Sequence, residues 1–212
     1  MIDYAHGAAV DAHTLHLAPS ADGTAQASAE QRGATCLVIL ARADDAAGAA
    51  AAGTAIRIAR AARYVPTLCR TREFWVEMIE HIDTYLGTHP AGGECGLLLA
   101  GIIDGRIVGA GVGDIAAWLF STGTARELNR GRDADAVVGS ALAEPAGFGP
   151  VPLDGTLMLA TGELIRDCGI DSLRDAALSV SLGGGCDAIA ERIAARRPAQ
   201  GPGYAAALCR TR

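Results

Sequence analysis

The sequence contains no lysine: all 18 basic residues are arginine, and Asn129 is the single asparagine. The absence of lysine excludes mechanisms that need a lysine amine, such as Schiff-base catalysis, the phosphate-binding P-loop and the kinase-type nucleotide site. Aromatic residues make up only 4% of the chain, whereas apolar residues make up 50%. We therefore expect a core built from small side chains, and disorder of the whole chain is excluded.

Long apolar runs and paired cysteines are also missing. The longest apolar stretch, residues 46–55, consists of alanine and glycine apart from Thr54, and no run approaches the ~20 residues that a membrane span needs. Residues 1–10 show no secretory signal pattern. The six cysteines are scattered without a C-x-x-C pair, which argues against a zinc site. We expect reduced thiols and a cytoplasmic protein.

The charge balance limits the classes of partner. Acidic residues number 24 against 18 basic ones, which gives a formal net charge of −6. Because nucleic acids and anionic membranes are polyanions, this balance argues against both as partners. The length of 212 residues predicts a single domain over 1–212.

Periodicity and turn residues predict the order of the elements. Apolar and alternating runs predict strands at residues 11–17, 34–41, 153–161 and 204–210. Helical spacing predicts helices at residues 46–64, 71–86, 171–178 and 186–197, the last two separated by the glycines at 183–185. Two hairpins are expected, with turns at 104–105 and 121–123. Residues 18–33 are expected to form an exposed loop, and residues 129–148 a loop with a short helix.

This order indicates an α+β fold, with helices covering the faces of an antiparallel meander. Three segments carry a resemblance to a known family: GLLLAGIIDGRIVGAGVGD at 96–114, AWLF at 117–120 and PVPLDGTLMLATGEL at 150–164. Near the start, VDAH at 10–13 and the Asp44-Asp45 pair add to it. The chain resembles the protein phosphatase 2C family of metal-dependent Ser/Thr phosphatases.

The resemblance implies a four-layer α-β-β-α sandwich with two antiparallel sheets packed face to face. It also implies a cleft in which two Mg²⁺ or Mn²⁺ ions activate water for attack on a phosphoserine or phosphothreonine. Two such cations repel each other, so several carboxylates must supply oxygen ligands and compensating charge.

Residue by residue, the resemblance leaves few of these carboxylates in place. The first acidic motif falls on Val10 and Asp11, and the second on Asp44 or, preferably, Asp45. The third falls on Gly162, although a shift of one position brings in Glu163. The last falls at about Pro202, and the family's phosphate-binding arginine falls near His6.

The remaining motif of the resemblance, Gly-Asp-Ser-Arg, keeps only Gly113 and Asp114. Asp11, Asp44 and Asp45 are candidates for one weak metal site, holding Mg²⁺, Mn²⁺ or Ca²⁺. Asp114 and Glu163 are candidates for the cleft. The alternative interpretation makes Asp44 and Asp45 a turn and helix-capping pair, and Asp114 a turn residue.

Three hypotheses follow. The first is a pseudophosphatase, a phosphatase-2C-like domain with a degenerate metal site that acts as a binding or regulatory module for a protein partner or phosphoprotein. The second is an active Mg/Mn-dependent protein phosphatase that recruits other acids, such as Glu163, Asp167 or Asp187. The third is an unrelated α+β structural or oligomer-forming protein, which would lack two stacked antiparallel sheets.

Overall fold

A computed structural model of the chain describes residues 10–17, 24–32, 35–89, 92–196 and 203–211. Its strands form two five-stranded antiparallel sheets, ordered β1-β10-β9-β6-β7 and β2-β3-β4-β5-β8. The strands are β1 (Val10–Leu17), β2 (Thr24–Arg32), β3 (Thr35–Ala43), β4 (Gly96–Ile103), β5 (Arg106–Val112), β6 (Ile115–Ser121), β7 (Thr124–Glu127), β8 (Ala146–Pro152), β9 (Thr156–Thr161) and β10 (Tyr204–Thr211). The helices are α1 (Ala46–Ala61), α2 (Arg72–Thr88), α3 (Gly162–Cys168), α4 (Ile170–Ala177) and α5 (Leu182–Arg196).

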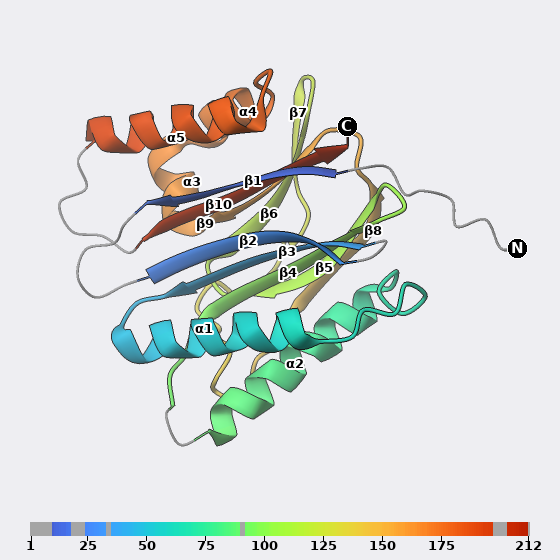
Figure 1. Ribbon diagram of the computed structural model, residues 1–212. Coiled ribbons are helices and arrows are strands. Elements are labelled where there is room, and N and C mark those ends of the chain that lie inside the picture. The colour runs from blue at the N-terminus through green and yellow to red at the C-terminus, as the bar shows by residue number, and fades with distance from the viewer. Residues whose placement is uncertain (1–9, 18–23, 33–34, 90–91, 197–202, 212) are drawn as a thin grey trace, which may run out of the picture.

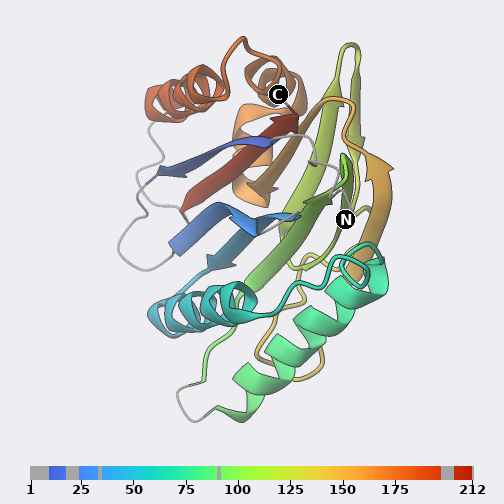
Figure 2. The ribbon, with the colours of Figure 1, turned by 45° about the vertical axis from the view of Figure 1, so that its right-hand side comes forward.

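The two sheets pack face to face between two layers of helices. Helices α1 and α2 cover the outer face of the β2-containing sheet, and α3, α4 and α5 cover that of the β1-containing sheet (Figure 1). The turned view shows the same four layers (Figure 2). The α-β-β-α sandwich expected from the resemblance is confirmed, and the hypothesis of an unrelated fold is wrong.

Apolar side chains fill three successive layers. Strand β3 lies inside its sheet, so that Leu37 and Ile39 pack against α1 and α2 while Val38 and Leu40 pack between the sheets. Because side chains alternate between the two faces of a strand, a strand buried on both faces has an unbroken apolar sequence. This explains why residues 34–41 do not alternate with polar ones.

The turn residues decide where the hairpins close. Strands β4 and β5 are joined by Asp104 and Gly105, which both have positive φ angles, of 50° and 69°. Positive φ at both central residues is what a two-residue turn between antiparallel strands requires. The second hairpin, β6–β7, closes at residues 122–123, with Gly123 at a φ of 81°. Both predicted hairpins are confirmed.

The expected loop at residues 18–33 is wrong for its described part. Residues 24–32 form β2, an edge strand that pairs along its whole length with β3. Its alanines, Ala25, Ala27 and Ala29, alternate with polar residues and face the layer between the sheets. An edge strand needs little apolar surface, so alternating alanines were the only sequence signal.

The glycines at 183–185 do not separate two helices, because all three lie within α5. A Cβ atom at Gly185 would overlap the backbone oxygen of Ala176 in α4. Glycine is therefore explained here by the close approach of two helices. Helix α3, which sequence periodicity did not predict, follows β9 directly.

Residues 129–145 contain no helix, so the short helix predicted there is also wrong. Asn129 instead binds β6 through its buried side chain: Nδ2 donates to the Ile115 oxygen at 3.0 Å, and Oδ1 accepts from the Ala117 nitrogen at 2.9 Å.

Among the helices of the described chain, none is long and apolar enough to cross a membrane.

Candidate functional site

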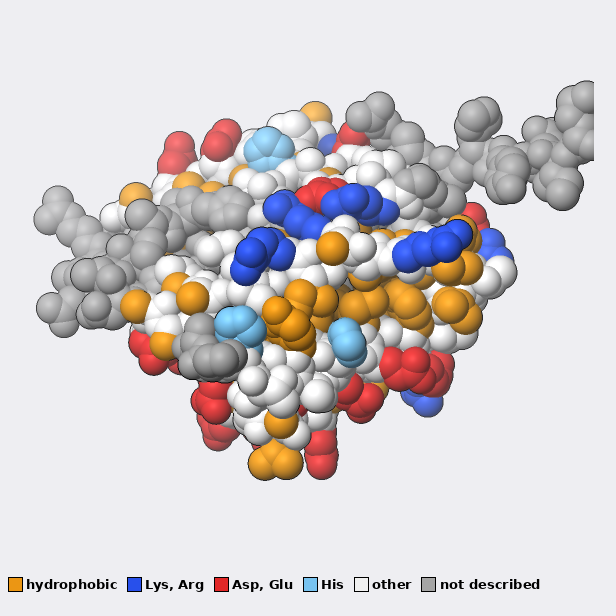
Figure 3. Space-filling view, turned by 60° about the horizontal axis from the view of Figure 1, so that its bottom comes forward, with side chains coloured by type: hydrophobic (Ala, Val, Ile, Leu, Met, Phe, Trp, Pro, Cys, Tyr) orange, Lys and Arg blue, Asp and Glu red, His pale blue; other side chains and the backbone are white. Residues whose placement is uncertain are grey.

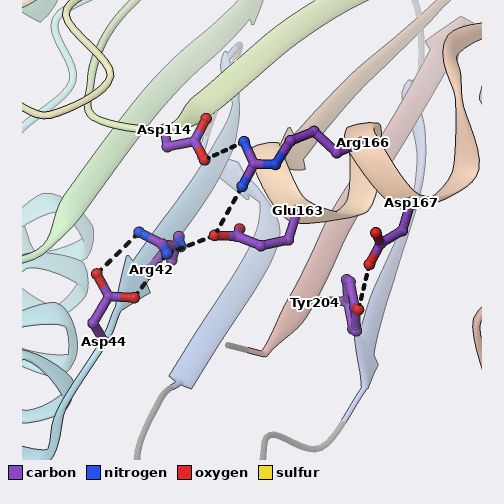
Figure 4. A network of polar contacts seen from close by, with 7 residues as sticks. All are labelled: Arg42, Asp44, Asp114, Glu163, Arg166, Asp167 and Tyr204. Atoms are coloured by element: carbon purple, nitrogen blue, oxygen red, sulfur yellow. Dashed lines mark hydrogen bonds and ion pairs between the residues drawn. The ribbon is translucent and has the colours of Figure 1, made fainter. Parts of the chain in front are cut away.

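Three segments from the two sheets meet at one end of the sandwich. Strand β3 ends there, the turn between β5 and β6 lies beside it, and α3 begins there (Figure 1). The Gly162 nitrogen donates to the Asp114 oxygen at 2.8 Å, and Ile115 pairs with Thr161. These backbone contacts bring Arg42, Asp114 and Glu163 into one cluster (Figure 4).

Arg42 bridges the two sheets. Its Nη2 lies 2.7 Å from a carboxylate oxygen of Asp44 and 2.5 Å from Oε1 of Glu163. The side chains of Arg42 and Glu163 are only 16% and 12% exposed, whereas that of Asp44 is 70% exposed. The ion pair with Glu163 is thus largely removed from water, which strengthens the attraction between the two charges.

Arg166 binds the same acidic cluster from α3. Its Nη1 lies 2.8 Å from Oδ2 of Asp114, and its Nη2 lies 3.3 Å from Oε1 of Glu163. The hydrogen bond to Asp114 raises the pKa of the Arg166 guanidinium. Two guanidinium groups therefore share one oxygen of Glu163, and the three carboxylates leave the cluster with one net negative charge.

The absence of a side chain at Gly162 leaves space for the carboxylate of Asp114. A Cβ atom at this position would overlap the carboxylate of Asp114, which reaches past α3 to Arg166. The resemblance places one of the family's acidic ligands at Gly162. The acid that the family has here and the Asp114–Arg166 ion pair of this chain are therefore sterically incompatible.

Tyr204 anchors α3 to β10 beside the cluster. Its hydroxyl donates to Oδ2 of Asp167 at 2.5 Å (Figure 4). Burial and this hydrogen bond raise the pKa of Tyr204 to about 12. Asp167 is thus engaged by a neutral phenol, while Asp187 is exposed on α5.

Asp45 caps a helix. Its Oδ1 accepts from the Gly48 nitrogen at 2.7 Å at the start of α1. A side-chain oxygen at this position satisfies one of the unpaired nitrogens of the first helical turn. The structure thus gives Asp45 the capping role of the alternative interpretation, and Asp44 an ion pair with Arg42.

Asp11 lies far from this end of the sandwich. In β1 it is opposite Arg210, whereas Leu17, at the other end of the strand, is opposite Tyr204. Six residues of extended chain, at ~3.3 Å each, separate Asp11 from the Tyr204 end by about 20 Å. The structure does not bring Asp11 together with Asp44 and Asp45. His6 and Pro202 lie outside the described residues.

A polar cavity of about 410 Å³ opens beside Arg42, lined also by Asp44, Asp45 and Glu94. Asp83, which is buried in α2, binds the segment that contributes Gly139 to the lining of this cavity. Its carboxylate accepts from three backbone nitrogens, of Gly139 at 2.6 Å, Ala141 at 3.1 Å and Ala143 at 2.9 Å.

The residues present do not fit a pair of divalent cations. Within the described chain, no group of three or more histidine, cysteine, aspartate or glutamate side chains is placed to hold a metal ion. Asp44, Asp114 and Glu163 each contact a guanidinium, and Asp45 caps α1. Oε2 of Glu163 is the one buried carboxylate oxygen in the described cluster without a hydrogen-bond partner.

Sequence reasoning missed the two arginines. Arg42 stands between Ala41 and Ala43 in a buried strand, and a charge within an apolar run was the available signal. Arg166 lies three residues after Glu163, the spacing of an ion pair on one helix face.

No protein-family model and no curated protein matches the chain. Solved structures match it in fold, at TM-scores of about 0.7–0.8. The S. agalactiae serine/threonine phosphatase has a TM-score of 0.77 at 17% identity, covering 96% of this chain and 100% of that one.

Two further structures agree. The PPM Ser-Thr phosphatase MsPP from Mycobacterium smegmatis has a TM-score of 0.69 at 15% identity, covering 98% and 100% of the two chains. PppA, a regulatory component of T6SS in Pseudomonas aeruginosa, has a TM-score of 0.71 at 15% identity, covering 96% and 98%. The resemblance drawn from the sequence is confirmed at the level of the fold: the chain has the fold of the bacterial PPM-type serine/threonine phosphatases, that of phosphatase 2C.

Proposed function

We propose that this chain is a single domain over 1–212 that does not hydrolyse phosphoesters and serves as a binding or regulatory module for a protein partner. The observation that carries the proposal is the pairing of Arg42 and Arg166 with the carboxylates at the end of the sandwich. Two positive charges already stand where metal ions would need negative ones.

Charge and desolvation explain why this arrangement opposes metal binding. A pair of divalent cations would have to displace Arg42 and Arg166 from Glu163 and Asp114. Displacement would leave the guanidinium of Arg42, which is only 16% exposed, without its carboxylate partner. A fully buried charge without a partner costs about 3–5 kcal/mol, and partial exposure lowers that cost. Mg²⁺ and Mn²⁺ would otherwise sit within a few ångströms of two guanidinium groups that stay charged at any pH of interest.

The partner is proposed to be a protein, with phosphoproteins included. The net charge of −6 argues against nucleic acid, as above. The fold is shared with PppA, which is described as a regulatory component, so that this fold occurs in proteins with regulatory roles. Similarity of fold does not fix the partner, which must be found by experiment.

The second candidate is an active Mg²⁺- or Mn²⁺-dependent phosphatase. One observation favours it: Oε2 of Glu163 is buried without a hydrogen-bond partner, and such an oxygen is a potential metal ligand. Asp167 would have to leave Tyr204, or Asp187 would have to reach across from α5, to complete a binuclear set.

The deciding experiment combines calorimetry with a turnover assay. The purified chain is titrated with Mn²⁺ and Mg²⁺ and incubated with each metal and a phosphoserine or phosphothreonine peptide. We expect neither saturable binding of two ions nor phosphate release above that of a Glu163→Gln variant. Metal-dependent release that Glu163→Gln abolishes, and that the exposed-site variant Glu191→Gln on α5 retains, would overturn the proposal.

A further inference from the structure

Helices α1 and α2 contact each other on the outer side of the β2-containing sheet and are inclined to each other (Figures 1 and 2). Figure 3 shows the surface on this side of the molecule. Three parallel bands cross it. Arginines border it on one side, apolar side chains with two histidines among them lie in the middle, and acidic side chains border the other side (Figure 3). The two borders therefore carry opposite charges.

The apolar band combines large side chains on α2 with small ones on α1. On α2, Phe74, Met78 and Tyr85 recur at helical spacing, and Tyr85 is 45% exposed. The exposed residues of α1 include Ala47, Ala50 and Ala61. A contiguous apolar strip with polar borders is typical of an interaction site.

The two charged rows are exposed. The basic row consists of Arg57 and Arg60 in α1 and Arg63 just after its end, and the acidic row consists of Glu73, Glu77 and Glu80 in α2. Arg60 is paired with Glu30, and Glu73 with Arg72. Within the described chain, Arg57, Arg63, Glu77 and Glu80 form no ion pair, so four charges on this face remain available to a partner.

We infer that the partner of this face is a second copy of the chain, related by a twofold axis that lies in the interface along the apolar band. This operation exchanges the two flanks, so the basic row of each copy faces the acidic row of the other. It also places the bulky stripe of each α2 against the alanines of the opposite α1. Charge and side-chain size are thus complementary under the same rotation.

The size of the face sets an upper limit on the area that the dimer can bury. At 1.5 Å per residue, helices of 16 and 17 residues are about 25 Å long, and two packed helices span about 20 Å. The face therefore covers about 500 Å² per copy, or about 1,000 Å² in total, near the lower limit for a specific interface. A reversible, concentration-dependent dimer follows, weakened by salt because its rim is charged.

Two charge-reversed variants test this inference by sedimentation velocity. Arg57→Glu with Arg63→Glu makes both rows acidic, and Glu77→Arg with Glu80→Arg makes both rows basic. We expect the unaltered chain to dimerise from low to high micromolar concentration and each variant alone to stay monomeric. An equimolar mixture of the two variants should form a 1:1 heterodimer, because its rows are again complementary.

The control carries the same charge change on the opposite layer: Arg126→Glu in β7 with Arg192→Glu in α5, both exposed. It should dimerise as the unaltered chain does. The inference is wrong if the unaltered chain remains monomeric at high micromolar concentration, if both variants dimerise like it, or if the mixture stays monomeric. The inference is also wrong if a different protein binds this face while the chain itself stays monomeric.

Discussion

The guanidinium of Arg42 lies 2.5 Å from the carboxylate of Glu163 and so connects the end of β3 in one sheet with the start of α3 on the other. Few polar contacts could join the two sheets at this end, because apolar side chains fill the layer between them. The pair acts as a clamp across the sandwich, made from the protein's own charges.

Removal of this clamp should destabilise the protein. Arg42→Met keeps most of the side-chain volume but leaves Glu163 without its closest positive charge. Because both side chains retain some exposure and Arg166 remains nearby, we expect a loss of about 2–3 kcal/mol, below the full cost of a broken buried pair. Urea denaturation measures it, with Arg130→Met as the exposed control, which should change the free energy of unfolding by less than about 0.5 kcal/mol.

Under the proposed function, Arg42 and Arg166 oppose the binding of cations at this end of the sandwich. In a variant with both Arg42→Met and Arg166→Met, the carboxylates of Asp44, Asp114 and Glu163 lose their positive partners. Mn²⁺ should then raise the melting temperature, since a ligand that binds only the folded state stabilises it. The same melting-temperature increase in the unaltered chain would contradict the blocking role of the arginines.

Gly162 should resist substitution for a steric reason. A Cβ atom there overlaps the Asp114 carboxylate, so Gly162→Ala must displace Asp114 from Arg166. We expect a loss of about 1–3 kcal/mol, in the range of overpacking. The loss should shrink in an Asp114→Ala background, and a double-mutant cycle by urea denaturation measures this coupling. Additive effects of the two changes would show that the side chains do not compete.

Asp83 should control the order of residues 139–143. Its buried carboxylate accepts three backbone hydrogen bonds from that segment, and no other acceptor replaces it in Asp83→Ala. Donors left unsatisfied cost about 1–3 kcal/mol each if they remain buried. Amide hydrogen exchange at Gly139, Ala141 and Ala143 should accelerate. In the control Glu191→Ala, on the exposed side of α5, exchange at these amides should be unchanged.

Stability should fall at alkaline pH. Burial raises the pKa of the Cys95 thiol from 9.0 to about 12, and burial with the Asp167 hydrogen bond raises that of Tyr204 from 10.0 to about 12. The unfolded chain therefore loses these protons first as the pH rises. The contribution of these two protonated groups to the free energy of unfolding is complete below about pH 9 and is lost as the pH rises toward 12. Urea titrations across this range should show the decline, with a smaller slope in Tyr204→Phe.

The sequence was informative wherever local chemistry dominates. Asp104 and Gly105 predicted their turn because few residues accept positive φ, and the stripe of Trp75, Ile79 and Ile82 predicted α2 because helical spacing places these side chains on one face. Strand β2 was missed because an edge strand of alternating alanines carries little hydrophobic signal. The glycines of α5 were misread as a break between two helices. Gly185 is explained by its close contact with α4, and a contact between two helices is not visible in the local sequence.

The acidic residues of the site show the same division. Asp44, Asp45, Asp114 and Glu163 could be selected as candidates from their places after strands and in the resembling motifs. Their partners could not, because Arg42, Asp114 and Arg166 are separated by dozens of residues and meet only when two sheets stack. By itself the sequence determined most of the helices and strands, since apolar periodicity acts locally, and the four layers were what the family resemblance implied. Only the tertiary structure decided what the carboxylates bind, since electrostatic attraction depends on distance in space and not along the chain.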